Sequence, residues 1–248
     1  MDCLLPDDIL CESCGYRIGG LPITGACPEC GELISRSLPD SRIGLPSQNK
    51  GGWWATSFTI LFEPRTGFRS VRIDPQSGFF YCRRTFLAAA AIVGLGISLA
   101  SFATTDESLG PIRMSLGDVI VMALLMGGAA FVLTLPVLAV LTAIECWGIR
   151  LVGTRRGWRI TPAVASTVCD FASVGWLIGS VVFAIGVCAS VILLIVVPSS
   201  ERTAAMFAAV ISSGGAGVGL LTFETLVYIG IRQCRFANPP TSHTRSRP

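Results

Sequence analysis

The sequence predicts a mainly α-helical, polytopic membrane helix bundle with a small N-terminal ribbon that holds a metal ion on four cysteines. One observation is an uncharged run from Phe171 to Val197. As a helix it would reach about 40 Å, more than the ~30 Å hydrocarbon core of a bilayer. A second is a pair of C-x-x-C motifs near the N-terminus. The composition agrees, because 51% of the residues are hydrophobic and only 14% are charged, against about 25% charged in soluble domains.

The strongest local signal lies in residues 11–31, which read CESCGYRIGGLPITGACPECG. A glycine follows each C-x-x-C pair and permits the tight turn that aims two thiolates at one ion. The Gly- and Pro-rich stretch between the pairs fits a short β-hairpin. The six remaining cysteines are scattered, which favours metal binding over a disulfide framework. We predict one structural Zn²⁺, with iron as the less favoured metal, on Cys11, Cys14, Cys27 and Cys30.

At these residues the chain resembles the zinc-ribbon family and also the rubredoxin-like module of rubrerythrins, which shares CxxCGY and CPxCG. The second resemblance implies a redox-active iron. The sequence has no Glu-x-x-His pair for a di-iron site, and its only histidine, His243, lies in the tail. Zinc is therefore favoured, and a membrane-anchored, rubredoxin-like iron redox protein stays an alternative.

Charge argues against nucleic acid as the partner of the ribbon. Residues 1–40 contain seven acidic side chains against Arg17 and Arg36, whereas phosphate binding needs a basic face. We expect a protein partner to bind through the ribbon instead. The ribbon is assigned to residues 1–36, and the Ser-, Pro- and Gly-containing stretch 37–52 to a flexible linker.

Residues 53–82 are predicted to form an amphipathic segment at the membrane surface. Aromatic side chains followed by arginines, just before a span, suit the headgroup layer. The alternative is a short helix packed on the cytosolic ends of the spans. The predicted membrane-surface residues are Trp53, Trp54, Arg65, Arg69 and Arg72.

Four spans are predicted within a bundle over 83–232, at about 85–105, 119–145, 170–197 and 203–231. Basic residues alternate rich, poor, rich, poor and rich along the connections. By the positive-inside rule this predicts a multi-pass protein of the cytoplasmic (inner) membrane with both termini in the cytoplasm, and 233–248 as a disordered basic tail. If 160–197 instead forms two spans joined near Gly175, the bundle has five and one terminus lies outside.

Three acidic residues lie in or beside the predicted spans: Glu145, Asp170 and Glu224. The orientation places all three near the cytoplasmic arginines, which favours interfacial ion pairing. A small transporter or channel that uses Asp170 and Glu224 is the alternative. Two G-x-x-x-G pairs, Gly175 with Gly179 and Gly215 with Gly219, permit close helix contact within the bundle or between protomers of a homo-oligomer.

The membrane part, roughly 55–232, resembles the Yip1-like group of multi-span proteins in ILFEPRTGFRSV before the first span and in its short loops. That family has five spans and is linked to membrane organisation and vesicle traffic. The ribbon joined to such a domain resembles bacterial membrane proteins, notably from planctomycetes. The sequence has no nucleophile–base pair, phosphate loop or zinc-hydrolase helix. We therefore expect a non-enzymatic integral membrane scaffold or interaction protein, with a role in membrane organisation.

Overall fold

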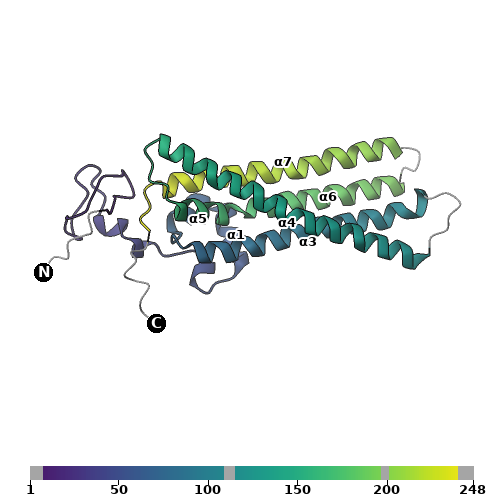
Figure 1. Cartoon of the computed structure of the whole chain (residues 1–248), viewed down its shortest axis with the longest axis horizontal. Coiled ribbons are helices and arrows are strands. Elements are labelled where there is room, and N and C mark those ends of the chain that lie inside the picture. The colour runs from purple at the N-terminus through teal and green to yellow at the C-terminus, as the bar shows by residue number, and fades with distance from the viewer. Residues whose placement is uncertain (1–7, 109–114, 197–200, 240–248) are drawn as a thin grey trace. The chain divides into compact units, whose positions relative to one another are not determined.

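A computed structural model describes residues 8–108, 115–196 and 201–239. The end of the predicted tail, with His243, lies outside these ranges. The described residues are mainly α-helical and contain no β-strand. The short 3₁₀ helices η1, η2 and η3 come first, and the α-helices α1 to α7 follow (Figure 1). Their bounds are η1 Ile34–Ser37, η2 Pro39–Ser41, η3 Pro46–Asn49, α1 Trp53–Phe62, α2 Pro64–Ser70, α3 Pro75–Ser108, α4 Leu116–Arg155, α5 Pro162–Ala172, α6 Val174–Val196 and α7 Glu201–Cys234.

Four helical segments are long and apolar enough to cross a membrane: Pro75–Phe102, Leu116–Arg155, Pro162–Leu193 and Gly214–Cys234. This agrees with the prediction of four candidate spans. The break between α5 and α6 falls at Ser173, two residues before the position where a fifth span would have begun. By length and composition, the two helices together make one candidate span.

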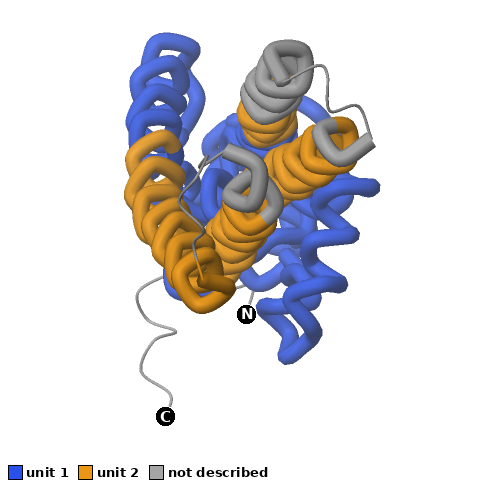
Figure 2. The backbone as a smooth tube through the Cα atoms, turned by 90° about the vertical axis from the view of Figure 1, so that its right-hand side faces the viewer, with its two compact units in different colours: residues 1–82, 142–172, 225–248 blue, residues 83–141, 173–224 orange. Residues whose placement is uncertain are grey.

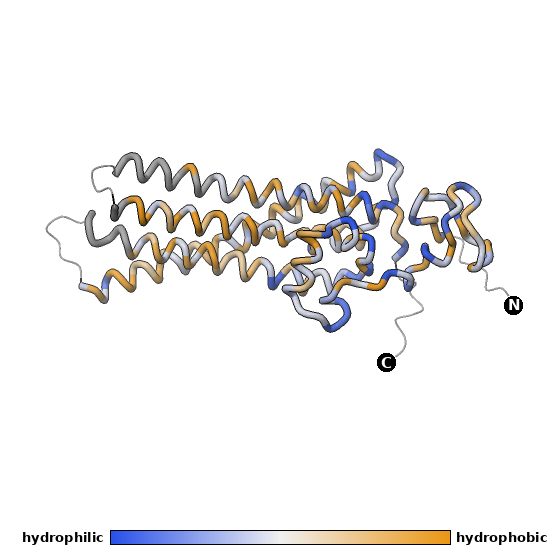
Figure 3. The backbone as a smooth tube through the Cα atoms, turned by 180° about the vertical axis from the view of Figure 1, so that it is seen from behind, coloured by the Kyte–Doolittle hydropathy of each residue, from blue (hydrophilic) through white to orange (hydrophobic). Residues whose placement is uncertain are grey.

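The chain divides into two compact units (Figure 2). Unit 1 comprises residues 1–82, 142–172 and 225–248, and unit 2 comprises 83–141 and 173–224. The helices of unit 2 are coloured mostly from white to orange by hydropathy, whereas blue, hydrophilic residues are frequent in unit 1 (Figure 3).

Glycines lie where the helices of unit 2 cross at close range. A Cβ on Gly179 of α6 would lie 2.5 Å from the Cα of Gly219 on α7. Likewise, a Cβ on Gly94 of α3 would lie 2.8 Å from the carbonyl oxygen of Gly127 on α4. Both crossings therefore exclude a larger side chain, as the spacing of small residues in membrane helices leads one to expect.

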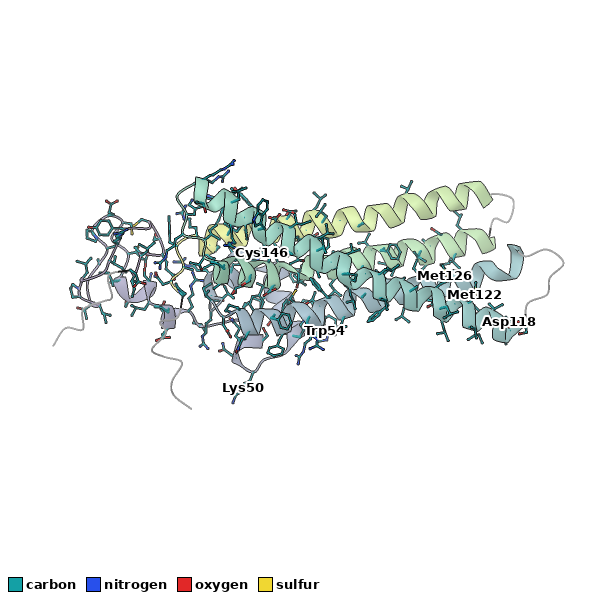
Figure 4. The ribbon with its side chains drawn as sticks, in the orientation of Figure 1. Lys50, Trp54, Asp118, Met122, Met126 and Cys146 are labelled. Carbon is teal, nitrogen blue, oxygen red and sulfur yellow. The ribbon has the colours of Figure 1, made fainter. Side chains whose placement is uncertain are left out.

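The outward surface of α4 is apolar. Met122 and Met126 lie one turn apart on this helix and are about half exposed (Figure 4). Only 11% of the residues in the most apolar stretch of α4 are buried. Such a face suits contact with lipid tails, because a soluble protein rarely exposes a continuous apolar surface of this size.

Unit 1 contains the ribbon and the short helices. Ser57 of α1 and Tyr81 of α3 share a hydrogen bond of 2.8 Å, and Tyr81 packs against Phe171 of α5 with ring centroids 5.0 Å apart. The stretch predicted as a linker includes η2 and η3 and buries Arg42 and Leu45. Its flexibility stays a prediction.

Candidate metal centre

The four cysteines of the two C-x-x-C pairs meet at one point. Their sulfur atoms all lie within 4.8 Å of one another. The Sγ–Sγ distance is 3.6 Å both between Cys11 and Cys30 and between Cys14 and Cys27. A tetrahedral ion with metal–sulfur bonds of about 2.3 Å would place its ligands about 3.8 Å apart. The site therefore fits a four-coordinate metal ion, with every ligand supplied by the protein.

Two loops with the same hydrogen bonds build this site, offset by sixteen residues. In the first, Gly15 N–H donates to the Cys11 carbonyl at 2.8 Å, and Cys11 N–H donates to the Tyr16 carbonyl at 2.8 Å. In the second, Gly31 and Cys27 repeat these bonds at 2.9 Å and 2.8 Å, with Glu32 as the second acceptor. Gly15 and Gly31 have φ of +84° and +73°, a left-handed conformation that glycine adopts without strain.

The β-hairpin expected between the two cysteine pairs is not formed as strands. Each knuckle is instead closed by an isolated antiparallel bridge, Leu10 with Arg17 and Ala26 with Leu33. Ile18 and Ile34 occupy equivalent positions after the two knuckles, and both are buried beside the cysteines. The module is so small that its core consists of these few aliphatic side chains and the cysteines themselves.

The thiols differ in how readily they ionise without a metal. Burial raises the pKa of Cys11. Burial, together with the neighbouring Cys27 and Cys30 thiols, raises the pKa of Cys14 to about 12. Burial also opposes ionisation of Cys27, but the backbone N–H groups of Cys30 and Glu29, together with the Cys14 and Cys30 thiols, outweigh it and lower the Cys27 pKa to about 7. Such N–H donors stabilise a metal-bound thiolate in the same way.

A buried ion pair fastens the ribbon to the helical part of unit 1. Arg42 is only 4% exposed, and its NH2 group lies 2.9 Å from Oε2 of Glu12, which lies within the first knuckle. Its NH1 group donates to the carbonyls of Phe68 and Val71, at the end of α2, at 3.2 and 3.1 Å. Nothing in the sequence singles out Arg42, because an arginine between Ser and Ile in a polar stretch carries no signal of burial.

The residues that follow α7 cover the first knuckle. Asn238 donates to the carbonyls of Leu10 and Ser37, both at 2.8 Å, and accepts from Leu10 N–H at 3.1 Å. A Cβ on Gly15 would lie 2.7 Å from the ring of Phe236, so the knuckle glycine is also required for this packing. Residues from both ends of the chain thus support the metal site.

The predicted membrane-surface residues divide into two groups. Trp54 is 60% exposed (Figure 4), and Phe58 and Phe62 of the same helix are 57% and 76% exposed, whereas Trp53 packs near Tyr81 with centroids 6.5 Å apart. Arg65 and Arg69 are exposed on α2. Arg72 instead donates from Nε to the Arg42 carbonyl at 3.0 Å.

The acidic residues of the spans do not line the apolar groove of unit 2. That groove, of about 370 Å³, is lined by α3, α4, α6 and α7, and its described wall holds no Asp or Glu. Asp170, in unit 1, accepts a hydrogen bond from the Cys82 thiol, and Glu145 lies near Cys146 and Cys169. Glu224 belongs to unit 2 and is half-buried.

Comparison of the chain with protein-family models, curated proteins and solved structures gave no match. Its class therefore follows from two features of its own structure. Four apolar helices are candidates to cross a membrane, and four N-terminal cysteines can hold a metal ion.

Proposed function

We propose that this protein is a non-enzymatic integral membrane scaffold, in which a structural zinc ion holds a small N-terminal ribbon in the form that contacts a partner protein. The observation that carries the proposal is the closed Cys₄ cluster, fastened to the helical part of unit 1 by Glu12, Arg42 and Asn238. Four protein thiolates fill a tetrahedral shell, so the ion offers no open position to a substrate. Its role is then to stabilise the ribbon.

Zinc is the favoured ion because the sequence has no Glu-x-x-His pair for a second, di-iron site that would support electron transfer. The chain has one histidine, and it lies in the tail. Iron in the same cysteines would make the protein a rubredoxin-like redox carrier, and the thiolate set alone accepts either metal. The colour of the purified protein separates these two alternatives.

The distribution of arginine supports a cytoplasmic ribbon. Of the arginines that the structure describes, only Arg83, Arg84 and Arg202 belong to unit 2. Unit 1 contains the other described arginines together with the ribbon. Under the positive-inside rule the arginine-rich unit faces the cytoplasm, where reducing conditions keep cysteines available for metal. The exposed aromatic side chains of α1 suit the bilayer interface on the same side.

Metal analysis of the purified full-length chain tests the proposed cofactor. We expect about one zinc per chain, no visible absorbance, and loss of the metal in the Cys11→Ser variant. Cys188→Ser is the matched control, because this cysteine is exposed in α6 and lies outside the cluster. One iron per chain together with a red colour would contradict the scaffold proposal and would indicate a redox function instead.

Site-specific photo-cross-linking in cells tests the proposed role in binding a partner. A photoreactive residue in place of Tyr16, which is exposed beside the first knuckle, should give one discrete protein adduct. The adduct should disappear when Cys11→Ser removes the metal. The same residue in place of Lys50, exposed outside the ribbon (Figure 4), serves as the control position. An adduct of equal yield without metal would contradict a ribbon-dependent contact.

A further inference from the structure

A pocket of about 920 Å³ opens in unit 1 between the ribbon, residues 41–43, α2 and the C-terminal turns of α7. Its charged lining consists of two glutamates, Glu12 and Glu32, and six arginines. We name it the arginine pocket after these residues: Arg36, Arg42, Arg65, Arg69, Arg232 and Arg235. Its volume is within the range of sites that hold a small ligand or headgroup.

The two glutamates neutralise only two of the six arginines. Glu12 pairs with the buried Arg42. Glu32 Oε1 lies 2.8 Å from Arg36 NH1. The lining therefore keeps a formal surplus of four positive charges, on Arg65, Arg69, Arg232 and Arg235.

These four arginines use few or none of their guanidinium N–H donors. Within the part of the chain that the structure describes, the side chains of Arg65 and Arg69 make no hydrogen bond or ion pair, and they lie one turn apart on α2. Arg232 contacts the hydroxyl of Tyr228 at 3.3 Å, and Arg235 donates to the Ser13 carbonyl at 3.1 Å. Each guanidinium carries five N–H donors. Like charges at this spacing repel one another, and an anion between them would turn repulsion into attraction.

A close contact between α2 and α7 creates this arrangement. Gly230 of α7 leaves room for the ring of Phe68, which would lie 3.0 Å from a Cβ at that position. Arg65 and Arg69 flank Phe68 in the sequence, and Arg232 follows Gly230 by two residues. The Phe68 carbonyl also accepts from Arg42 at 3.2 Å. The cationic groups therefore gather because the backbone packs closely, and their repulsion opposes that packing.

We propose that the arginine pocket binds the phosphate of an anionic phospholipid headgroup. Guanidinium groups match phosphate oxygens in pairs of parallel hydrogen bonds. Tyr228, which is 55% exposed, and Arg232 belong to the last turns of the candidate span Gly214–Cys234, and headgroups lie where a span ends. The inference rests on the membrane insertion in the proposed function, but on neither the identity of the metal nor the partner protein.

Native mass spectrometry of the full-length, metal-loaded protein in a non-ionic detergent tests the proposal. Titration with phosphatidylglycerol should give one retained lipid per chain, held at least about tenfold more tightly than phosphatidylcholine, whose choline compensates the phosphate charge. Sodium phosphate and glycerol 3-phosphate, added separately, should compete only weakly. Binding of these soluble ions as tight as that of the lipid would assign the pocket to a soluble phosphate compound and overturn the lipid proposal.

Matched variants separate the pocket from general surface charge. Arg65→Gln with Arg69→Gln, and Arg232→Gln alone, should each weaken phosphatidylglycerol binding about tenfold. Arg83→Gln with Arg84→Gln removes the same charge from exposed arginines outside the pocket and should leave binding unchanged. An equal loss in this control would overturn the proposal.

If the glutamine pair loses its metal or aggregates, Arg65→Lys with Arg69→Lys replaces it. This variant keeps the charge but loses the paired guanidinium hydrogen bonds. Unchanged lipid binding in a folded lysine variant would also count against the pocket. Because the readout is lipid retained by purified protein, it is independent of whether the ribbon cross-links to a partner.

Discussion

Arg42 shows how much one residue contributes to this protein. Its guanidinium bonds Glu12 on the ribbon side and two carbonyls at the end of α2 on the other. A buried charge is stable only if it is paired and hydrogen-bonded. Arg42 satisfies that condition only when the ribbon sits against α2, so the ion pair specifies the docked arrangement.

Replacing Glu12 by Gln should therefore loosen the ribbon strongly. The variant leaves the Arg42 charge buried without its partner, which costs about 3–5 kcal/mol. Glu32→Gln is the matched control, because Glu32 pairs with Arg36 at the surface, where an ion pair contributes less than about 1 kcal/mol. Hydrogen exchange of the ribbon amides measures both. Equal protection in the two variants would show that the buried pair does not hold the ribbon.

The ionisation of the cysteines predicts how metal affinity depends on pH. In the metal-free protein the raised pKa values keep Cys11 and Cys14 protonated at neutral pH, so a metal must displace at least these two protons. Affinity should then rise with pH, by about two or more logarithmic units per pH unit between pH 6 and 7. Competition with a chromophoric chelator measures this slope, and a slope near zero would contradict protonated thiols.

At the scale of the helices, glycine decides how closely α6 and α7 approach. Gly179 and Gly219 meet backbone to backbone, and Gly175 faces Phe223 with only 2.5 Å between a Cβ and the Phe223 nitrogen. Both G-x-x-x-G pairs recognised in the sequence are thus used within unit 2. Contacts inside the unit account for their spacing, and a second protomer is not required to explain it.

Enlarging one of these glycines should separate the helices. Gly179→Leu is expected to destabilise the protein by about 2 kcal/mol or more, because the clash is with backbone that cannot move aside. Gly214→Leu is the control, since a Cβ there meets nothing within 4 Å. The apparent melting temperature in detergent should fall by about 5 °C or more for the first variant and stay constant for the second. A similar decrease in both would point to a general effect of leucine.

At the scale of the whole molecule, loss of the metal should destabilise the ribbon of unit 1 more than the helices of unit 2. The core of the ribbon consists of a few aliphatic side chains and the cysteines, too few to fold a module of this size without metal. The four candidate spans carry their own apolar surface and glycine contacts. Metal loss is therefore expected to unfold the ribbon while the long helices persist.

Chelation of the purified chain tests this division. Trypsin should then cleave rapidly at Arg17 and Arg36, both exposed in the ribbon, while the helical circular dichroism changes little. Restoring zinc should restore resistance at these sites. Cleavage at Arg83 or Arg84 at the same rate as at Arg17 would show that the metal stabilises the entire chain.

The sequence by itself determined the features that depend on local pattern. Uncharged runs of span length need no tertiary context to be recognised, because a bilayer sets their length. Two C-x-x-C-G pairs likewise point to one metal ion, since the motif carries its ligands and its turn together. The G-x-x-x-G pairs likewise marked the crossings of α6 and α7, because the spacing of small residues is itself a local pattern.

Only the tertiary structure decided which polar residues far apart in sequence work together. Glu12, Arg42 and Asn238 are joined by hydrogen bonds that no spacing predicts. The arginines of the pocket come from the ribbon, the stretch after it, α2, and the end of α7 with the residue that follows, and along the chain they resemble ordinary basic flanks of spans. Charge pattern predicts the side of the membrane on which arginines lie. Whether they converge on one ligand depends on the close packing of Gly230 against Phe68.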